Sequence, residues 1–356
     1  MPPLKVSVLR DVGRLAQKSS TNLRELGRLP HPMLRRRGEA GFSQISWDDA
    51  LELATAKIAA SSPERLGFYL TSRGMPNEGY YGAQKAVRAL GSANIDNAAR
   101  VCHTPSTVAL KSTIGVAAST CSYSDWIASD VIVFIGSNVA NNQPVATQYL
   151  HHSIQRGAKV VSVNTYIEPG MERYCIPSIP ESAVFGTRLT DRFYQINTGG
   201  DAAFLSGVLK HILHNGLEDS AFIAAHTSGL EELRTSLEAT TWETLEAQSG
   251  SMQLEMQNLG QLLGEAKSAV LVWSMGVTQH ATGEDNVRAI VNIAVPRGFV
   301  GREGCGLMPI RGHSGVQGGA EMGADSTALP GGKAVNEQNA ALLEAQYGFP
   351  IPSSAD

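Results

Sequence analysis

The chain has 356 residues, of which 42% are apolar, and its 29 basic and 33 acidic side chains give a formal charge of −4. This length can bury one large core or two smaller ones, and the apolar share excludes an intrinsically disordered chain. The charge shows no basic excess, so nothing favours nucleic acid or an anionic membrane surface as a partner.

The N-terminal part is expected to form an arm. Residues 1–40 are polar and arginine-rich, and Arg35–Arg37 are followed by polar residues rather than by the apolar segment of an export signal. No apolar stretch approaches the roughly 20 residues that cross a bilayer. We therefore predict no membrane span and a cytoplasmic location.

The cysteines are far apart in the sequence. They are Cys102, Cys121, Cys175 and Cys305, and no CxxC motif occurs. This spacing argues against an iron–sulfur cluster or a zinc knuckle held by this chain alone, so we expect no iron–sulfur cluster. A disulfide framework is unusual at this size, which favours a reducing compartment.

The segment after the arm predicts two helices with a strand between them. Ser46 is suited to cap the first helix, with Asp49 three residues later to complete the cap. An apolar strand is expected near 65–72, and a second helix over 77–90. The first helix is also supported by apolar residues at helical spacing, namely Leu51, Ala54 and Ile58.

Strands and helices then alternate along the chain. Continuous apolar runs predict buried parallel strands at 130–136, 158–164 and 268–276. Between and after these strands we expect helices over 143–157, 199–213 and 284–295. The first should place Val145, Tyr149 and Ile154 on one side, and the second should be capped by Asp201. This alternation predicts an α/β fold with a doubly wound, mostly parallel, Rossmann-like sheet covered by helices on both faces.

The predicted elements suggest a domain division. We predict a sheet domain over 98–312 that is inserted into a second α/β domain formed by 41–97 plus 313–356, after the arm of 1–40. The last residues end without a helix cap or a completed unit, so the second domain is expected to be incomplete.

One edge of the predicted sheet is rich in polar groups. Ligands of open α/β sheets bind beyond the carboxyl ends of the strands. Amides, hydroxyls and glycines occupy that edge at 137–143, 164–166, 197–201 and 274–278. They suit a large ligand with phosphates and a base, although the same residues also make tight turns. Neither GxGxxG nor GxxxxGK[ST] occurs, which disfavours an ordinary NAD-dependent dehydrogenase.

Two motifs flank the sheet domain and are expected to meet at its base. RVCHTPS places Cys102 beside His103, and PIRGHSGVQGGAEMGAD contains Arg311. An arginine pairs well with a carboxylate, a thiolate beside positive charge binds soft metals, and a histidine moves protons. The residues alone leave Cys102 open as a buried spacer, a nucleophile, a disulfide partner or a metal ligand.

Several motifs resemble a known family. NAARVCHTPSTVAL, followed by STIG, resembles the active-site segment of molybdopterin-dependent formate dehydrogenases, and the stretches at 269–295 and 309–324 are similar to later segments of that family. GTRLTDRFYQINTGGDAAF is similar to the formate-dehydrogenase-like "oxidoreductase alpha subunit" branch of the DMSO reductase superfamily. The resemblance runs from about Arg28 to about Gly332, and implies a fold like domains 1–3 of formate dehydrogenase and DMSO reductase.

The resemblance implies roles for individual residues. Cys102 would bind molybdenum, His103 would accept or relay the substrate proton, and Arg311 would hold the formate carboxylate. The cofactor would be Mo-bis(molybdopterin guanine dinucleotide). Its nucleotide half would be lined by Gly136, Asn138, Asn142, Asn164, Gly200, Asp201, Gly276 and Val277, and its pterin or metal would be approached by Gly312, Ser314 and Gln317.

The implied reaction is the two-electron oxidation of formate, or of a similar small anion; formate would give CO2. Family members commonly carry an N-terminal cluster-binding cysteine segment and a C-terminal capping domain, and this chain matches neither. We therefore expect an electron-transfer partner or a partner chain that supplies the capping domain. The alternative is a catalytically silent cofactor-binding fragment.

Overall fold

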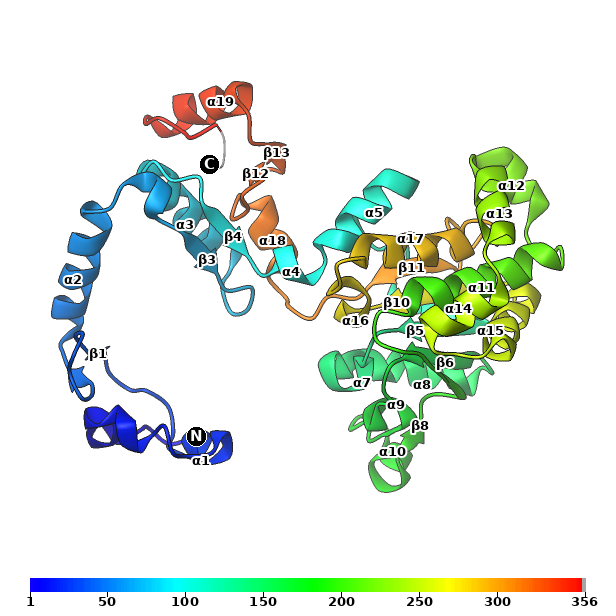
Figure 1. Cartoon of the computed structure of the whole chain (residues 1–356), viewed down its shortest axis with the longest axis horizontal. Coiled ribbons are helices and arrows are strands. Elements are labelled where there is room, and N and C mark those ends of the chain that lie inside the picture. The colour runs from blue at the N-terminus through cyan, green and yellow to red at the C-terminus, as the bar shows by residue number, and fades with distance from the viewer. Residues whose placement is uncertain (354–356) are drawn as a thin grey trace.

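The computed structural model describes residues 1–353, and its main unit, on the right in Figure 1, is built on a parallel β-sheet. Five strands pair in the order β11-β10-β5-β6-β9, and every pair is parallel. All positions of β5 and β10 are buried, as expected of continuous apolar runs. The strands are β5 (Val131–Ile135), β6 (Lys159–Asn164), β9 (Arg192–Gln195), β10 (Ala269–Trp273) and β11 (Gly306–Pro309). The predicted doubly wound α/β fold is confirmed.

Helices cover both faces of this sheet because successive strand residues point to opposite sides. Val131, Val133 and Ile135 of β5 pack with one set of helices, and Ile132 and Phe134 pack with the other. The first set comprises α5 (Thr104–Ile114), α11 (Asp201–His214), α14 (Trp242–Ser249), α15 (Gln253–Glu265) and α17 (Gly283–Ala294). The second comprises α6 (Tyr123–Ala128), α7 (Val139–Asn142), α8 (Thr147–Gln155) and α9 (Pro169–Glu172).

Shorter elements complete this unit. They are α10 (Pro180–Phe185), α12 (Ser220–His226), α13 (Leu230–Ala239), α16 (Met275–Thr278), and the antiparallel pair β7 (Arg173–Tyr174) and β8 (Thr187–Arg188).

Two details of the predicted helices are wrong. Gly200 is the N-cap of α11, whereas the predicted cap Asp201 is already its first helical residue. Val145 is 73% exposed because it lies in a 3₁₀ turn before α8, whose buried positions are instead Thr147, Leu150 and Ser153.

A smaller unit brings together segments from before and after the sheet. β3 (Phe68–Leu70) and β4 (Ile95–Asn97) form a parallel pair beside α3 (Asn77–Ala89) and α18 (Val316–Glu321). The Asn97 side-chain amide donates to the Ala324 carbonyl at 2.6 Å, so these distant segments lie side by side. The remaining elements here are α4 (Ala99–Cys102), β12 (Ala328–Leu329), β13 (Lys333–Ala334) and α19 (Glu337–Tyr347). The division into 41–97 plus 313–356 and 98–312 stays a proposal.

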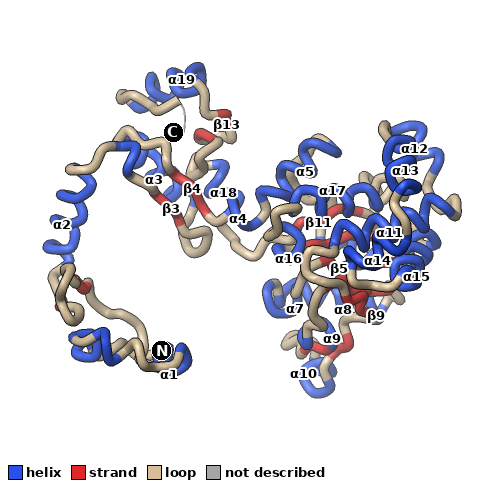
Figure 2. Tube along the Cα trace, in the orientation of Figure 1, coloured by secondary structure: helices blue, strands red, loops and turns tan. Residues whose placement is uncertain are grey.

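The N-terminal region stands away from the sheet (Figures 1 and 2). It contains two 3₁₀ turns (Val6–Arg10 and Val12–Arg14), α1 (Ser20–Glu25), and the antiparallel pair β1 (Met33–Leu34) and β2 (Ser43–Gln44), which spans the predicted boundary at residue 40. α2 (Trp47–Ala59) begins with the predicted capping box of Ser46 and Asp49, but none of its residues is buried. Within 1–353, no helix is long and apolar enough to cross a membrane.

Candidate functional site

Cys102 and Arg311 lie together in the structure. Cys102 ends α4, and Arg311 follows β11 after one intervening residue. Burial raises the pKa of the Cys102 thiol, while the charge of Arg311 and a hydrogen bond from the Gly312 backbone N–H lower it in part. Burial lowers the pKa of Arg311, and Cys102 acts in the opposite direction. The two flanking motifs meet as predicted, because His103 Nε2 lies 3.0 Å from the carbonyl oxygen of Ile310.

The backbone at Cys102 is held by residues that follow β10. The Thr278 hydroxyl donates to the carbonyl of Cys102, and the Gln279 amide donates to the carbonyl of Val101 at 3.2 Å. Both donors come from the turn at the carboxyl end of the central strand β10. The position of the thiol is thus set by the edge of the sheet.

Three consecutive carbonyls hold the Arg311 segment. The Ile310 oxygen lies 3.0 Å from His103 Nε2, the Arg311 oxygen accepts from Gln143 Nε2 at 2.9 Å, and the Gly312 oxygen accepts from Arg73 Nη2 at 3.3 Å. These bonds fix the main chain at Arg311 and at its two neighbours. Arg73 is absent from the predicted site. Gln143 and Thr278 lie in the polar stretches predicted at the sheet edge, but nothing in their local sequence points to the carbonyls that they hold.

His103 is fully buried, and both of its ring nitrogens have partners. Nδ1 lies 3.0 Å from the Ser106 hydroxyl, and Nε2 lies 3.0 Å from the Ile310 carbonyl oxygen. Burial, followed by the nearby charge of Arg311, lowers the pKa of His103 to about 3. The ring is therefore neutral at physiological pH, with no nitrogen facing solvent.

A cavity of about 450 Å³ opens at the carboxyl edge of the sheet. Of the eight residues expected around a nucleotide, the cavity is lined by Gly136, Asn138, Asn142, Asn164, Asp201 and Gly276. The Val277 side chain is instead fully buried in the core, and Gly200 packs against the backbone of Ser249. Lining residues outside the predicted set include Glu168, Gln279 and His280.

Glycines let two loops approach each other beneath this cavity. Gly136 has a φ of +53°, and the Gly276 amide donates to its carbonyl at 3.1 Å. A Cβ added at Gly276 would lie only 2.6 Å from the Gly136 oxygen. The pair therefore forms a wall of bare backbone, which is the surface that phosphate groups approach closely.

Polar side chains surround this wall. The Asn138 amide donates to Glu168 at 2.8 Å, and a His280 ring nitrogen lies 2.8 Å from the Gly276 oxygen. Burial raises the pKa of Asp201, while His280 lowers it in part. Carboxylates and amides in this array suit the N–H groups and carbonyls of a nucleobase.

A second cavity, of about 590 Å³, lies beside Arg311. The three residues predicted near the pterin or metal, Gly312, Ser314 and Gln317, all line it. Cys121 and Tyr123 line this cavity as well, although no motif in the sequence predicted them there. Cys102 is 1% exposed and lines none of the described cavities, but Arg311 lines this one and Gln279 lines the first.

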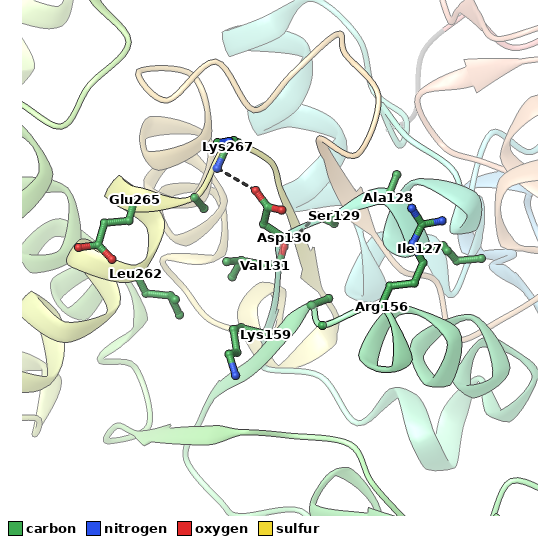
Figure 3. Close-up of a pocket in the computed structure, with 13 residues that line it drawn as sticks. Ile127, Ala128, Ser129, Asp130, Val131, Arg156, Lys159, Leu262, Glu265 and Lys267 are labelled. Atoms are coloured by element: carbon green, nitrogen blue, oxygen red, sulfur yellow. Dashed lines mark hydrogen bonds between the residues drawn. The ribbon is translucent and has the colours of Figure 1, made fainter.

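A third cavity, of about 470 Å³, lies at the opposite, amino edge of the strands (Figure 3). Arg156, Lys159 and Lys267 lie around it together with Asp130, whose carboxylate accepts from the Lys267 backbone N–H at 3.0 Å. This carboxylate links two loops, and the cavity lies apart from Cys102 and Arg311.

Comparison with known proteins decides the family. Residues 28–348 match the family described as molybdopterin oxidoreductase. The chain belongs to the molybdopterin oxidoreductase family. The predicted superfamily resemblance is thus confirmed, and membership implies a molybdopterin cofactor.

Relatives and a solved structure agree with this family. The chain is 31% identical over 343 residues to Protein YdeP of Escherichia coli K12, covering 93% of this chain and 44% of that protein. It is 32% identical over 319 residues to F420-dependent formate dehydrogenase 1 subunit alpha of Methanococcus maripaludis, covering 89% and 44%. Acetylene hydratase from Pelobacter acetylenicus shares the fold, with a TM-score of 0.60 and 21% identity over 79% of this chain and 37% of that one. The chain spans less than half the length of these proteins.

The residues present fit a molybdopterin cofactor on structural grounds. The Gly136–Gly276 wall leaves no room for a side chain, and Arg311 and the Gly312 N–H oppose the rise that burial causes in the pKa of the Cys102 thiol, so both favour the metal-binding thiolate. In addition, Gln143 Oε1 is buried and has no hydrogen-bond partner among the described residues, while the same amide holds Arg311. Such an acceptor beside the site is available to a donor on a bound group.

Proposed function

We propose that this molybdopterin oxidoreductase oxidises formate at a Mo-bis(molybdopterin guanine dinucleotide) centre, with Cys102 as the protein ligand to molybdenum. The observation that carries the proposal is the 3.0 Å contact between His103, next to Cys102, and the carbonyl of Ile310, next to Arg311, which brings the two motifs together. The formate dehydrogenase name of the Methanococcus maripaludis relative supports the choice of formate.

Arg311 would bind the substrate. A guanidinium presents two parallel N–H donors, which match the two oxygens of a carboxylate and fix its orientation. Its partly desolvated position strengthens this attraction relative to water. When bound, the cofactor would supply the acceptor for the two electrons that leave formate as it becomes CO2 and a proton.

The two cavities divide the remaining cofactor contacts. We assign the nucleotide half to the 450 Å³ cavity, where the Gly136–Gly276 wall would approach phosphates and Asp201 would accept from the base. The 590 Å³ cavity would place Gly312, Ser314 and Gln317 near the pterin or metal. Gly200 and Val277 do not line the nucleotide cavity, and would support it through packing, Gly200 against the Ser249 backbone and Val277 in the core.

Two residues must adjust for the expected chemistry. Cys102 is 1% exposed and lines none of the described cavities, so metal binding requires its thiol to become accessible. His103 donates through Nε2, and its lone pair at Nδ1 faces Ser106. A substrate proton therefore reaches His103 only if the bond to Ser106 opens.

The resemblance to formate dehydrogenases also supports an electron-transfer partner and a further polypeptide region that caps the site, and the sequence composition of the chain supports a cytoplasmic location. Purification from molybdate-supplied cells, with any copurifying chain retained, tests the whole proposal. We expect molybdenum, pterin and formate oxidation with a dye as electron acceptor.

Cys102→Ala should abolish formate oxidation, whereas the matched control Cys175→Ala should not, because Cys175 is exposed and lies outside the site. Formate oxidation that survives Cys102→Ala contradicts the assigned roles. A stable chain that purifies alone and without pterin supports the alternative, a silent cofactor-binding fragment.

A further inference from the structure

A closed ring of hydrogen bonds lies in the core behind the candidate site. Trp273 Nε1 donates to Ser106 Oγ at 2.8 Å, and this hydroxyl lies 3.0 Å from His103 Nδ1. His103 Nε2 lies 3.0 Å from the Ile310 oxygen, and the Ile310 N–H returns to the Trp273 carbonyl at 2.9 Å. Trp273, Ser106 and His103 are 0% exposed, and Ile310 is 5% exposed.

Only one arrangement of protons satisfies every member of this ring. A carbonyl can only accept, so His103 must carry its proton on Nε2, and Nδ1 of the neutral ring is then an acceptor. The Ser106 hydroxyl must donate to Nδ1, and its oxygen accepts from the Trp273 indole, which can only donate. The hydrogen bonds therefore run from Trp273 through Ser106 and His103 to Ile310.

We propose that Ser106 and Trp273 are positioning residues that lock His103 in its Nε2–H tautomer and thereby set the spacing between Cys102 and Arg311. His103 follows Cys102 directly, and Ile310 precedes Arg311 directly. The bond from His103 to Ile310 thus joins the two chain segments that carry Cys102 and Arg311. None of these residues needs to touch the substrate for this role.

The local structure around Ser106 explains why removal of its hydroxyl should displace His103 and Arg311. Ser106 lies in the first turn of α5, whose face packs against α17 and the sheet, so the helix does not move freely. Without its hydroxyl, the buried Nδ1 and the Trp273 N–H both lose their partner, which is costly in a dry core. The His103 ring is then expected to turn away, which releases the Ile310 carbonyl and shifts Arg311.

The functional part of this inference rests on the proposed formate oxidation, and two readouts separate the two ideas. The first is ring-nitrogen NMR of the labelled full chain, in which His103 should carry its proton on Nε2; a proton on Nδ1 overturns the inference whatever the activity. The second is the KM for formate in the loaded enzyme. An enzyme that does not oxidise formate contradicts the proposed function, while the NMR result still decides the tautomer.

Four variants measure the effect on substrate binding. Ser106→Ala should raise KM about tenfold, as expected for a lost buried hydrogen bond, with little change in kcat. Trp273→Phe keeps an aromatic side chain in the core but removes the indole N–H donor. It should raise KM only about threefold, because Ser106 still holds His103. Ser106→Thr, which keeps a hydroxyl, should restore KM. The control is Ser112→Ala, whose hydroxyl bonds only within α5.

The KM readout distinguishes positioning from mere packing. If Ser106 only supports the fold, Ser106→Ala lowers the melting temperature and the amount of active enzyme but leaves KM unchanged, and this result overturns the proposal. If Ser106→Ala does not fold, Trp273→Phe and the tautomer of the wild-type chain decide it. An equal rise of KM in Ser112→Ala also contradicts it.

Discussion

His103 Nε2 lies 3.0 Å from the carbonyl oxygen of Ile310, so the residue after Cys102 is bonded to the residue before Arg311. The carbonyl of Arg311 is held in turn by Gln143, and the carbonyl of Cys102 by Thr278. The thiol and the guanidinium are therefore placed by bonds between main chain and buried side chains. This arrangement makes the candidate site sensitive to substitutions that never touch the substrate.

Replacing Arg311 with lysine keeps the charge but removes the planar pair of donors. We expect Arg311→Lys to raise the KM for formate by about ten- to a hundredfold, because a charge-assisted hydrogen bond to the carboxylate is lost. Steady-state kinetics with formate measure the change. Arg156→Lys, at the opposite edge of the sheet, is the matched control and should leave KM unaltered. A normal KM in Arg311→Lys would remove Arg311 from the substrate site.

The pKa of His103 predicts a pH dependence of stability. In the folded chain it is about 3, below the ordinary value of 6.5, so the unfolded state binds the proton more tightly. The free energy of unfolding should therefore be unaffected above about pH 6.5 and fall as the pH drops toward 3. Between pH 7 and pH 5 this histidine should account for a loss of about 2 kcal/mol.

Urea unfolding of the chain without cofactor checks this prediction at both pH values. His103→Gln, which does not titrate, should lose less stability between them than the wild type. The same loss in both proteins would assign the pH dependence to other groups.

The cysteines should differ sharply in reactivity toward an alkylating reagent. Burial raises the pKa of Cys121 to about 12, and Cys102 and Cys305 are each 1% exposed, whereas Cys175 is exposed. Because the thiolate is the reactive form, Cys175 should be labelled first under native conditions. Peptide mass spectrometry after brief labelling identifies the site, and Cys175→Ser should remove the fast phase. Rapid labelling of Cys121 is the opposite outcome.

The Gly136–Gly276 contact predicts a steric effect on the nucleotide cavity. Gly276→Ala places a methyl group 2.6 Å from the Gly136 oxygen, so the loop must move. We expect a lower melting temperature and less bound pterin. Gly82→Ala is the control, because nothing lies within 4 Å of its added Cβ and alanine favours a helix. Full pterin content in Gly276→Ala would place the nucleotide elsewhere.

The sequence predicted the parts of the fold that have strong local signals. β5, β6 and β10 are uninterrupted apolar runs, and the Ser46–Asp49 capping box is a fixed local spacing. β9 and β11 were not predicted as strands. β9 is a short edge strand that carries Arg192 and Gln195, and β11 contains Gly306 and Pro309, residues that strands disfavour.

In the candidate site, too, the sequence predicted what local motifs indicate but not the contacts between distant residues. Its two flanking motifs predicted that Cys102 and Arg311 would meet, because both lie where the chain enters and leaves the sheet domain. The contact from His103 to Ile310 spans 207 positions, and that from Trp273 to Ser106 spans 167. Ser106 and Trp273 look like ordinary core residues in the sequence. Only the fold brings Ser106 of α5 next to Trp273 at the end of β10, where the two side chains bond to each other.

Molybdenum X-ray absorption of the purified, loaded protein tests most directly whether Cys102 binds the metal. If Cys102 is the protein ligand, Cys102→Ser removes one sulfur neighbour from the molybdenum while pterin content is retained. An identical metal environment in the wild type and in Cys102→Ser would contradict it.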